Sequence, residues 1–144
     1  MKKTLDATLV LLFLLLSFNR ADAIFDGKKA PRGTDWAYIN AQEKKIYIEA
    51  FKEGVLYVVA NYVPLLSKNL EVADEIKKLV VDLMETKTDT YIKQINEWYD
   101  MSDRYLCIPI NNMITLVFQQ FKYKINKQVM MTILDNFAKQ YNKK

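Results

Sequence analysis

Apolar side chains recur every three or four residues along most of the chain from residue 35 onward. This spacing is typical of α-helices that bury one face, and five such segments follow one another with short connections. The apolar positions of the five segments are Tyr47, Phe51, Gly54, Val55, Val58 and Tyr62; Val72, Ile76, Leu79, Val80 and Leu83; Tyr91, Ile92, Ile95, Trp98 and Tyr99; Ile114, Val117, Phe118 and Phe121; and Met130, Ile133, Leu134, Phe137 and Tyr141. We therefore predict an all-α protein, a single compact bundle of about five amphipathic helices.

Capping residues and helix breakers predict where these helices begin and end. Asn40 followed by Glu43 has the form of a capping box, so the first helix is expected to run from there to about Tyr62, with Pro64 stopping it. The residues expected to cap later helices are Asp89, Asn112 and Asn126. Short β-favouring runs have no partner run with hairpin chemistry, so strands are not expected.

The start of the chain has the pattern of an export signal. Residues 1–3 carry two lysines, an apolar run of 12 residues spans Ala7 to Phe18, and Ala21-Asp22-Ala23 forms a small-residue cleavage site. The run is well short of the roughly 20 residues that span a bilayer, so a cleaved signal peptide is favoured over an uncleaved anchor. We predict a signal peptide over 1–23, a flexible arm over 24–34 and one helical domain over 35–144, in the periplasm or secreted.

Composition excludes several classes of chemistry. The 144 residues include no histidine, one cysteine and three glycines, with 21 Lys plus Arg against 17 Asp plus Glu. A histidine-assisted nucleophile, a histidine zinc site, a cysteine cage and a glycine-rich phosphate loop are therefore not expected. The small and dispersed positive charge does not suggest nucleic-acid binding. We predict no cofactor, no metal, and no stable membrane span after signal cleavage.

Paired carboxylates are the remaining catalytic option, because glycoside hydrolysis requires only two positioned acids. The candidates are Glu53, Glu85, Asp89, Asp100 and Asp103. Carboxylates on helices are usually solvated surface groups, so we expect no catalysis from them. Asp100 and Asp103 also lack the alternating acids and the turn glycine of a calcium loop.

Aromatic residues are concentrated around the third helix and the segment after it. The chain has nine tyrosines, and Tyr91, Trp98, Tyr99 and Tyr105 lie within 15 residues of one another. Such rings seal the edge of a core or contact a partner, and both interpretations are open at this stage. Cys107, the one cysteine, is either buried and inert or available for an intermolecular disulfide.

Two groups of residues resemble a known family. The first group is Gly33, Asp35, Trp36, Lys45, Tyr47 and the run Phe51-Lys52-Glu53-Gly54. The second is Tyr91-Ile92, Trp98-Tyr99-Asp100 and the run Arg104-Tyr105-Leu106-Cys107-Ile108-Pro109-Ile110. Together they are similar to the Rap1a/Tai family of small exported helical proteins. The resemblance implies a periplasmic immunity protein that neutralises a cell-wall amidase effector of type VI secretion.

The leading hypothesis is a non-enzymatic periplasmic or secreted protein that binds another exported protein, with an immunity-type inhibitor of a cell-wall hydrolase as its specific form. The expected partner contacts are Trp98, Tyr99, Arg104 and Tyr105. The alternatives are a carrier that holds a small apolar ligand between helices, suggested by the aromatic residues and six methionines, and the carboxylate glycan hydrolase. A homodimer is a further option.

Overall fold

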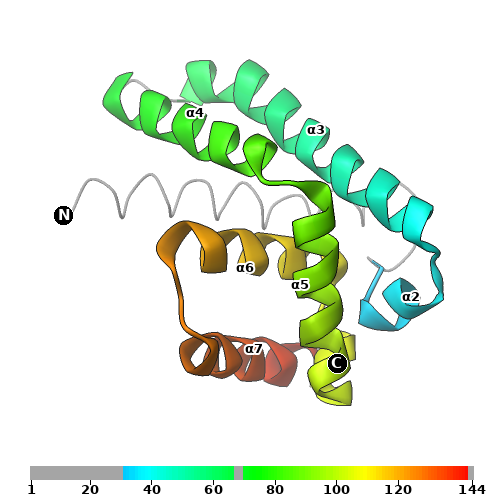
Figure 1. Cartoon of the computed structure of the whole chain (residues 1–144). Coiled ribbons are helices and arrows are strands. Elements are labelled where there is room, and N and C mark those ends of the chain that lie inside the picture. The colour runs from blue at the N-terminus through cyan, green and yellow to red at the C-terminus, as the bar shows by residue number, and fades with distance from the viewer. Residues whose placement is uncertain (1–30, 67–69, 143–144) are drawn as a thin grey trace.

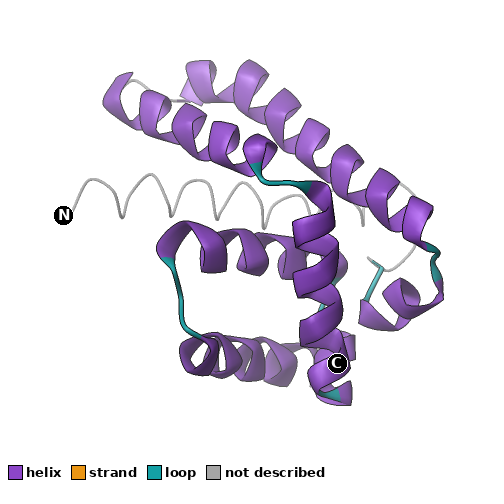
Figure 2. Cartoon of the chain, viewed as in Figure 1, coloured by secondary structure: helices purple, strands orange, loops and turns teal. Residues whose placement is uncertain are grey.

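The computed structural model describes residues 31–66 and 70–142, so the predicted signal peptide and residues 24–30 of the predicted arm lie outside the described residues. In chain order the elements are α2 (Gly33–Tyr38), α3 (Ala41–Leu66), α4 (Leu70–Glu85), α5 (Thr88–Met101), the 3₁₀ helix η1 (Asp103–Cys107), α6 (Ile110–Tyr123) and α7 (Lys127–Asn142). Within these residues there is no strand, only one isolated β-bridge between Arg32 and Pro109 (Figure 2). The prediction of an all-α bundle is confirmed.

Helix α5 connects the two halves of the bundle. The long helices α3 and α4 lie side by side, and α5 leaves the end of α4 at a steep angle to both (Figure 1). Helix α5 packs against α3, α6 and η1, and α7 packs against η1. In the described part of the chain, no helix has the length and apolar character needed to cross a bilayer.

The start of α3 is as predicted, but its end is not. The Asn40 side-chain oxygen accepts the backbone N–H groups of Gln42 and Glu43 at 2.9 and 3.0 Å, and the Glu43 carboxylate accepts the Asn40 N–H at 2.8 Å. The expected stop at Pro64 is wrong, because the helix continues to Leu66. Proline has a helical φ and costs one backbone hydrogen bond, a loss that a helix of 26 residues accommodates in its last turn.

The buried face of α3 is rotated by about one residue from the predicted face. Ile48, Lys52, Val55 and Val59 are buried, whereas the predicted ring of Phe51 is only partly covered. Lys52 was not among the predicted apolar positions, and lysine is rarely buried. Its ammonium group instead forms contacts with polar groups inside the fold, and these contacts allow Lys52 to lie on the buried face of α3.

Lys52 is 3% exposed and links α3 to the connection between α4 and α5. Its Nζ donates to the carbonyl oxygen of Thr86 at 2.7 Å and to the Thr88 hydroxyl at 3.2 Å, and it lies 3.7 Å from the Glu49 carboxylate. The same Nζ lies 5.5 Å from the centre of the Tyr91 ring. These contacts replace the hydration that the ammonium group loses on burial, which a buried cation requires.

The apolar faces predicted for α4 and α5 agree with the structure, apart from the predicted position Val72, whose side chain lies outside the described residues. Their buried members are Ile76, Leu79, Val80 and Leu83 in α4, and Tyr91, Ile95, Trp98 and Tyr99 in α5. Asp89 does not cap α5 as expected, because Lys87 occupies the cap position and Asp89 lies in the first turn. There its carboxylate pairs with Lys45 at 3.1 Å.

Helix α6 is buried on all sides over its first nine residues, which the single predicted stripe did not indicate. All nine residues from Ile110 to Phe118 are buried. The expected cap at Asn112 is wrong, because α6 begins directly after Pro109 and Asn112 lies inside it. The polar groups of this buried helix are paired: Tyr47 donates to Asn111 at 2.9 Å, and Asn112 donates to the Tyr141 hydroxyl at 2.6 Å.

Helix α7 begins as predicted. The side-chain oxygen of Asn126 accepts the backbone N–H of Val129 at 3.0 Å. This bond satisfies one of the unpaired N–H groups in the first turn of the helix.

Residues 31–34, predicted as the end of a flexible arm, are part of the fold. The Ile110 N–H donates to the Pro31 carbonyl at 2.9 Å, and the Gly33 N–H donates to the Ile108 carbonyl at 3.3 Å. A Cβ atom at Gly33 would lie 2.5 Å from a Tyr99 ring carbon and 2.9 Å from the Leu106 Cα. Glycine at this position therefore allows the start of α2 to contact α5 and η1 directly.

We predict that Gly33→Ala lowers the free energy of unfolding by about 1–3 kcal/mol, because the added methyl group must displace the Tyr99 ring or the backbone at Leu106. Urea denaturation followed by circular dichroism measures the change. The control is Thr34→Ala, at an exposed position in the same helix. Equal stability of the two variants would show that the contact with Tyr99 is not tight.

Candidate functional site

The four predicted contact residues lie at the junction of α5 and η1, but three of them face inward. Trp98, Tyr99 and Tyr105 are 1%, 4% and 0% exposed. The side chain of Arg104 is 53% exposed. The three rings thus lie in the core beneath the surface. Arg104 is the member of the group that is exposed to solvent.

The buried rings at this junction are held by hydrogen bonds. The Tyr99 hydroxyl donates to the Ile108 carbonyl at 3.0 Å. The Tyr105 hydroxyl donates to the Asp135 carboxylate at 2.9 Å, which also pairs with Arg104 at 3.0 Å. Burial raises the pKa of Tyr99 well above its usual value, and burial followed by the bond to Asp135 raises the pKa of Tyr105. Both hydroxyls remain protonated donors, so they hold α5, η1 and α7 in fixed relation.

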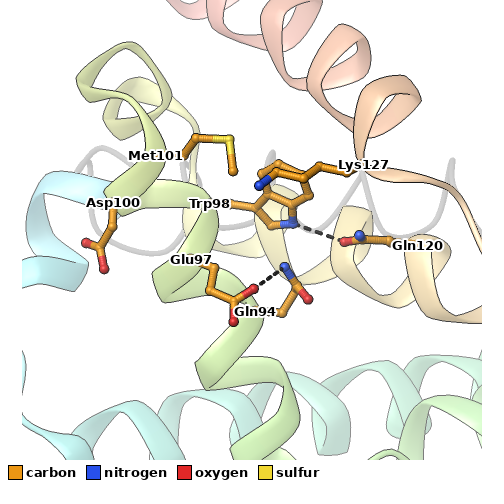
Figure 3. A pocket seen from close by; sticks show the side chains of 7 residues that line it. All are labelled: Gln94, Glu97, Trp98, Asp100, Met101, Gln120 and Lys127. Carbon is orange, nitrogen blue, oxygen red and sulfur yellow. Dashed lines mark hydrogen bonds between the residues drawn. The ribbon is translucent and has the colours of Figure 1, made fainter.

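An open pocket of about 530 Å³ lies beside this junction, between α5, the last turn of α6 and the first turn of α7 (Figure 3). The residues that line it are Gln94, Glu97, Trp98, Asp100, Met101, Gln120 and Lys127. The Trp98 indole N–H donates to the Gln120 side-chain oxygen at 3.0 Å, which fixes the ring at the base of the pocket. Met101 is 37% exposed and adds a second apolar surface.

The rim of the pocket is polar and charged. Gln94 donates to the Glu97 carboxylate at 3.1 Å. Glu97 and Asp100 come from α5, whereas Lys127 comes from α7 (Figure 3). An apolar base beneath a charged rim is the arrangement that holds one side chain of a binding partner and excludes water around it.

The five candidate carboxylates belong to four helices, α3, α4, α5 and η1. Glu53 is exposed on α3, Asp103 is exposed on η1, and Asp89 pairs with Lys45. Glu85 lines a second open pocket of about 360 Å³ near the end of α4, and Asp100 lines the pocket beside Trp98. Each of these two pockets holds one member of the candidate set together with a second carboxylate, Glu97 beside Asp100 in the first and Asp82 beside Glu85 in the second. Among the described residues, no group of three or more metal-ligating side chains is placed to hold a metal ion.

The positions of the methionines are relevant to the alternative that the protein carries a small apolar ligand between its helices. Met113 and Met130 are fully buried in the core, and Met84 and Met131 pack against it. Flexible methionine side chains also fill irregular gaps in cores, and these four pack in that way. Both pockets described above are open to solvent and have charged residues in their walls.

Cys107 is partly buried at the end of η1. Its Sγ lies 3.1 Å from the Arg104 carbonyl oxygen and 3.7 Å from the Ala138 carbonyl oxygen, positions in which a thiol donates. Burial raises the pKa of the Cys107 thiol. The protonated form is thus favoured, which makes the sulfur a weak nucleophile.

Sequence reasoning found Trp98 and Asp100 but missed the other residues of the pocket. Glu97, Gln120 and Lys127 belong to three helices and are far apart along the chain. The cap at Asn126 does indicate that Lys127 begins a helix. Nothing in the order of residues indicates that this helix begins beside the end of α5.

We predict that Gln120→Ala lowers the free energy of unfolding by about 1 kcal/mol, because the buried Trp98 indole N–H loses its acceptor. The Trp98 indole proton resonance should also move, which two-dimensional NMR of isotope-labelled protein measures. Gln119→Ala on the same helix is the matched control. If the two variants gave the same indole resonance, the bond between Trp98 and Gln120 would be absent in solution.

We predict that folded protein reacts with iodoacetamide at Cys107 more slowly than urea-unfolded protein, by roughly threefold or more at about pH 8. The raised folded-state pKa lowers the thiolate fraction. By the same linkage, the contribution of the thiol to stability is complete below the ordinary thiol pKa and is lost as the pH rises through the folded-state pKa. Mass spectrometry follows the alkylation, and equal rates in both states would contradict the burial of the sulfur.

Comparison of the chain with known protein families, with curated proteins and with solved structures finds no match. The resemblance to the Rap1a/Tai family therefore stays a prediction.

Proposed function

We propose that this protein is a non-enzymatic, exported binding protein that inhibits a cell-wall hydrolase, in the manner of an immunity protein. The pocket beside Trp98 and the adjoining η1 surface with Arg104 are the contact region. The protein acts by occupying the partner's cleft or its approaches, so it breaks no bond itself.

The observation that carries this proposal is the composition of the pocket. Met101, which is 37% exposed, supplies its apolar surface beside the Trp98 ring, which is 1% exposed, and its rim carries glutamines, two carboxylates and one ammonium group. Tryptophan, methionine and arginine are enriched at protein interfaces, where an apolar centre surrounded by polar groups supplies most of the affinity. The volume of about 530 Å³ is enough to accept a large side chain of a partner.

The supporting structure around the pocket favours binding in one fixed geometry. Trp98 is held by Gln120, and the Tyr105 hydroxyl and Arg104 share Asp135. These bonds connect α5 to α6 and η1 to α7. A surface ordered before binding loses little conformational entropy on association, which raises affinity.

The proposal predicts a site-specific contact with a hydrolase. The photo-crosslinking amino acid benzoylphenylalanine is placed at Met101, and in a matched control at Val81 on α4, which is 52% exposed and does not line the pocket. Each variant is mixed with individually purified secreted cell-wall hydrolases of the same organism. We expect one hydrolase to crosslink at Met101 and not at Val81.

The same mixtures measure inhibition. The hydrolase that crosslinks should lose most of its activity on purified cell wall at about one equivalent of the binding protein, as a tight complex requires. The proposal fails if no hydrolase is inhibited, if Met101 and Val81 give the same adducts, or if the purified protein itself degrades the cell wall.

A further inference from the structure

The pocket beside Trp98 carries opposite charges on its two sides. Glu97 and Asp100 form the acidic side, on the last turns of α5. Lys127 forms the basic side, on the first turn of α7. Figure 3 shows Lys127 approaching the Trp98 ring from α7, with Glu97 beside Gln94 on α5 and the Asp100 carboxylate directed away from the ring.

These charges are available to a ligand. Within the described residues, Glu97, Asp100 and Lys127 take part in none of the ion pairs, which connect other residues. Glu97 accepts one hydrogen bond from Gln94 and keeps further acceptor capacity. An unpaired charge on each side of an open pocket gains interaction energy only when a partner supplies the opposite charge.

The partial charges at the ends of α5 and α7 add to the charges of the neighbouring side chains. The last turn of α5 contains Asp100 and no basic residue, and the first turn of α7 begins with Lys127 and has no acidic residue. The carbonyl end of a helix carries partial negative charge and its N–H end partial positive charge. Each helix end therefore has the same sign as its neighbouring side chain, so neither charge is compensated within its own helix.

We propose that the pocket binds a partner segment with a basic side chain near Glu97 and Asp100, an acidic side chain near Lys127, and an apolar side chain between them on Met101, beside the Trp98 ring. This inference rests on the proposed function and defines the chemistry of its partner. A segment with two basic or two acidic side chains meets repulsion on one side of the pocket, so the arrangement also selects against it.

The two tryptophans of the chain make a direct test possible. The Trp98 indole lies at the pocket, whereas the Trp36 indole is buried elsewhere and donates to Asn96 at 2.8 Å. Isotope-labelled mature protein is titrated with acetyl-Arg-Leu-Glu-amide, and with the Arg-Leu-Arg, Glu-Leu-Glu and Gln-Leu-Gln peptides blocked in the same way. The blocking groups remove the terminal charges, so that only side chains differ.

We expect the Arg-Leu-Glu peptide to shift the Trp98 indole resonance in a saturable way while the Trp36 resonance stays in place. Its affinity should exceed that of each other peptide by roughly threefold or more, the factor expected for one exposed ion pair. Raising the salt to about 0.5 M should reduce the difference by screening. Absence of any shift at Trp98, or equal affinity for all four peptides, would overturn the inference.

A charge reversal provides the decisive variant. Lys127→Glu should make the Arg-Leu-Arg peptide the preferred ligand, whereas Lys139→Glu, an exposed position in the last turn of the same helix, should leave the order unchanged. An unchanged Trp36 resonance shows that each variant is folded. If K127E and K139E gave the same order of peptides, Lys127 would not contact the ligand and the inference would be wrong.

The inference about the charges of the pocket and the proposed function can fail independently of each other. Suppose that a hydrolase is inhibited and crosslinks at Met101, and that K127E binds it with unchanged affinity. The proposed function would then stand, and the inference about charge would be wrong. If the peptides were distinguished at Trp98 but no hydrolase were inhibited, the inference about the charges of the pocket would stand and the proposed immunity-type function would fail.

Discussion

The burial of the first nine residues of α6 on all sides is the constraint that brings distant segments of the chain together. A helix with nine consecutive buried residues must have neighbours on every face, and its polar side chains must find partners without water. Tyr47 of α3 and Tyr141 of α7 supply those partners for Asn111 and Asn112. The Pro31 carbonyl accepts the first N–H of the helix, at Ile110. Segments from both ends of the described chain are thereby brought against one helix.

That constraint also shapes the candidate site. Helix α5 packs against both α6 and η1, and α7 packs against η1, so the last turn of α5 comes to lie near the first turn of α7. The bond from Trp98 to Gln120 fastens α5 to α6 where the pocket forms. Asp135 then ties α7 to Arg104 and Tyr105 of η1. The pocket is a gap left where three helices meet, and its walls are held by bonds that belong to the core.

The aromatic residues illustrate two uses of one residue type. Their concentration around α5 suggested either a sealed core or a contact surface, and the structure places Tyr99 and Tyr105 inside the core with their hydroxyls paired. Trp98 serves both purposes, since its ring is almost fully buried yet forms the base of an open pocket. The proposed contact with a partner therefore depends on Met101 and the charged rim more than on the rings themselves.

Local chemistry determined much of this protein directly from its sequence. The 3.6-residue period gave the all-α class, and the caps at Asn40 and Asn126 were correct because a cap depends on residues only two or three positions away. The inward turn of Lys52, the burial of Asn112 and the docking of Pro31 were not predictable, because each depends on a partner more than 25 residues distant along the chain. The pocket belongs to the same class: Glu97, Gln120 and Lys127 come together only through the packing of α5, α6 and α7. Periodicity specifies which face of a helix is apolar, whereas tertiary packing decides which helix ends meet and which charges face one another across a gap.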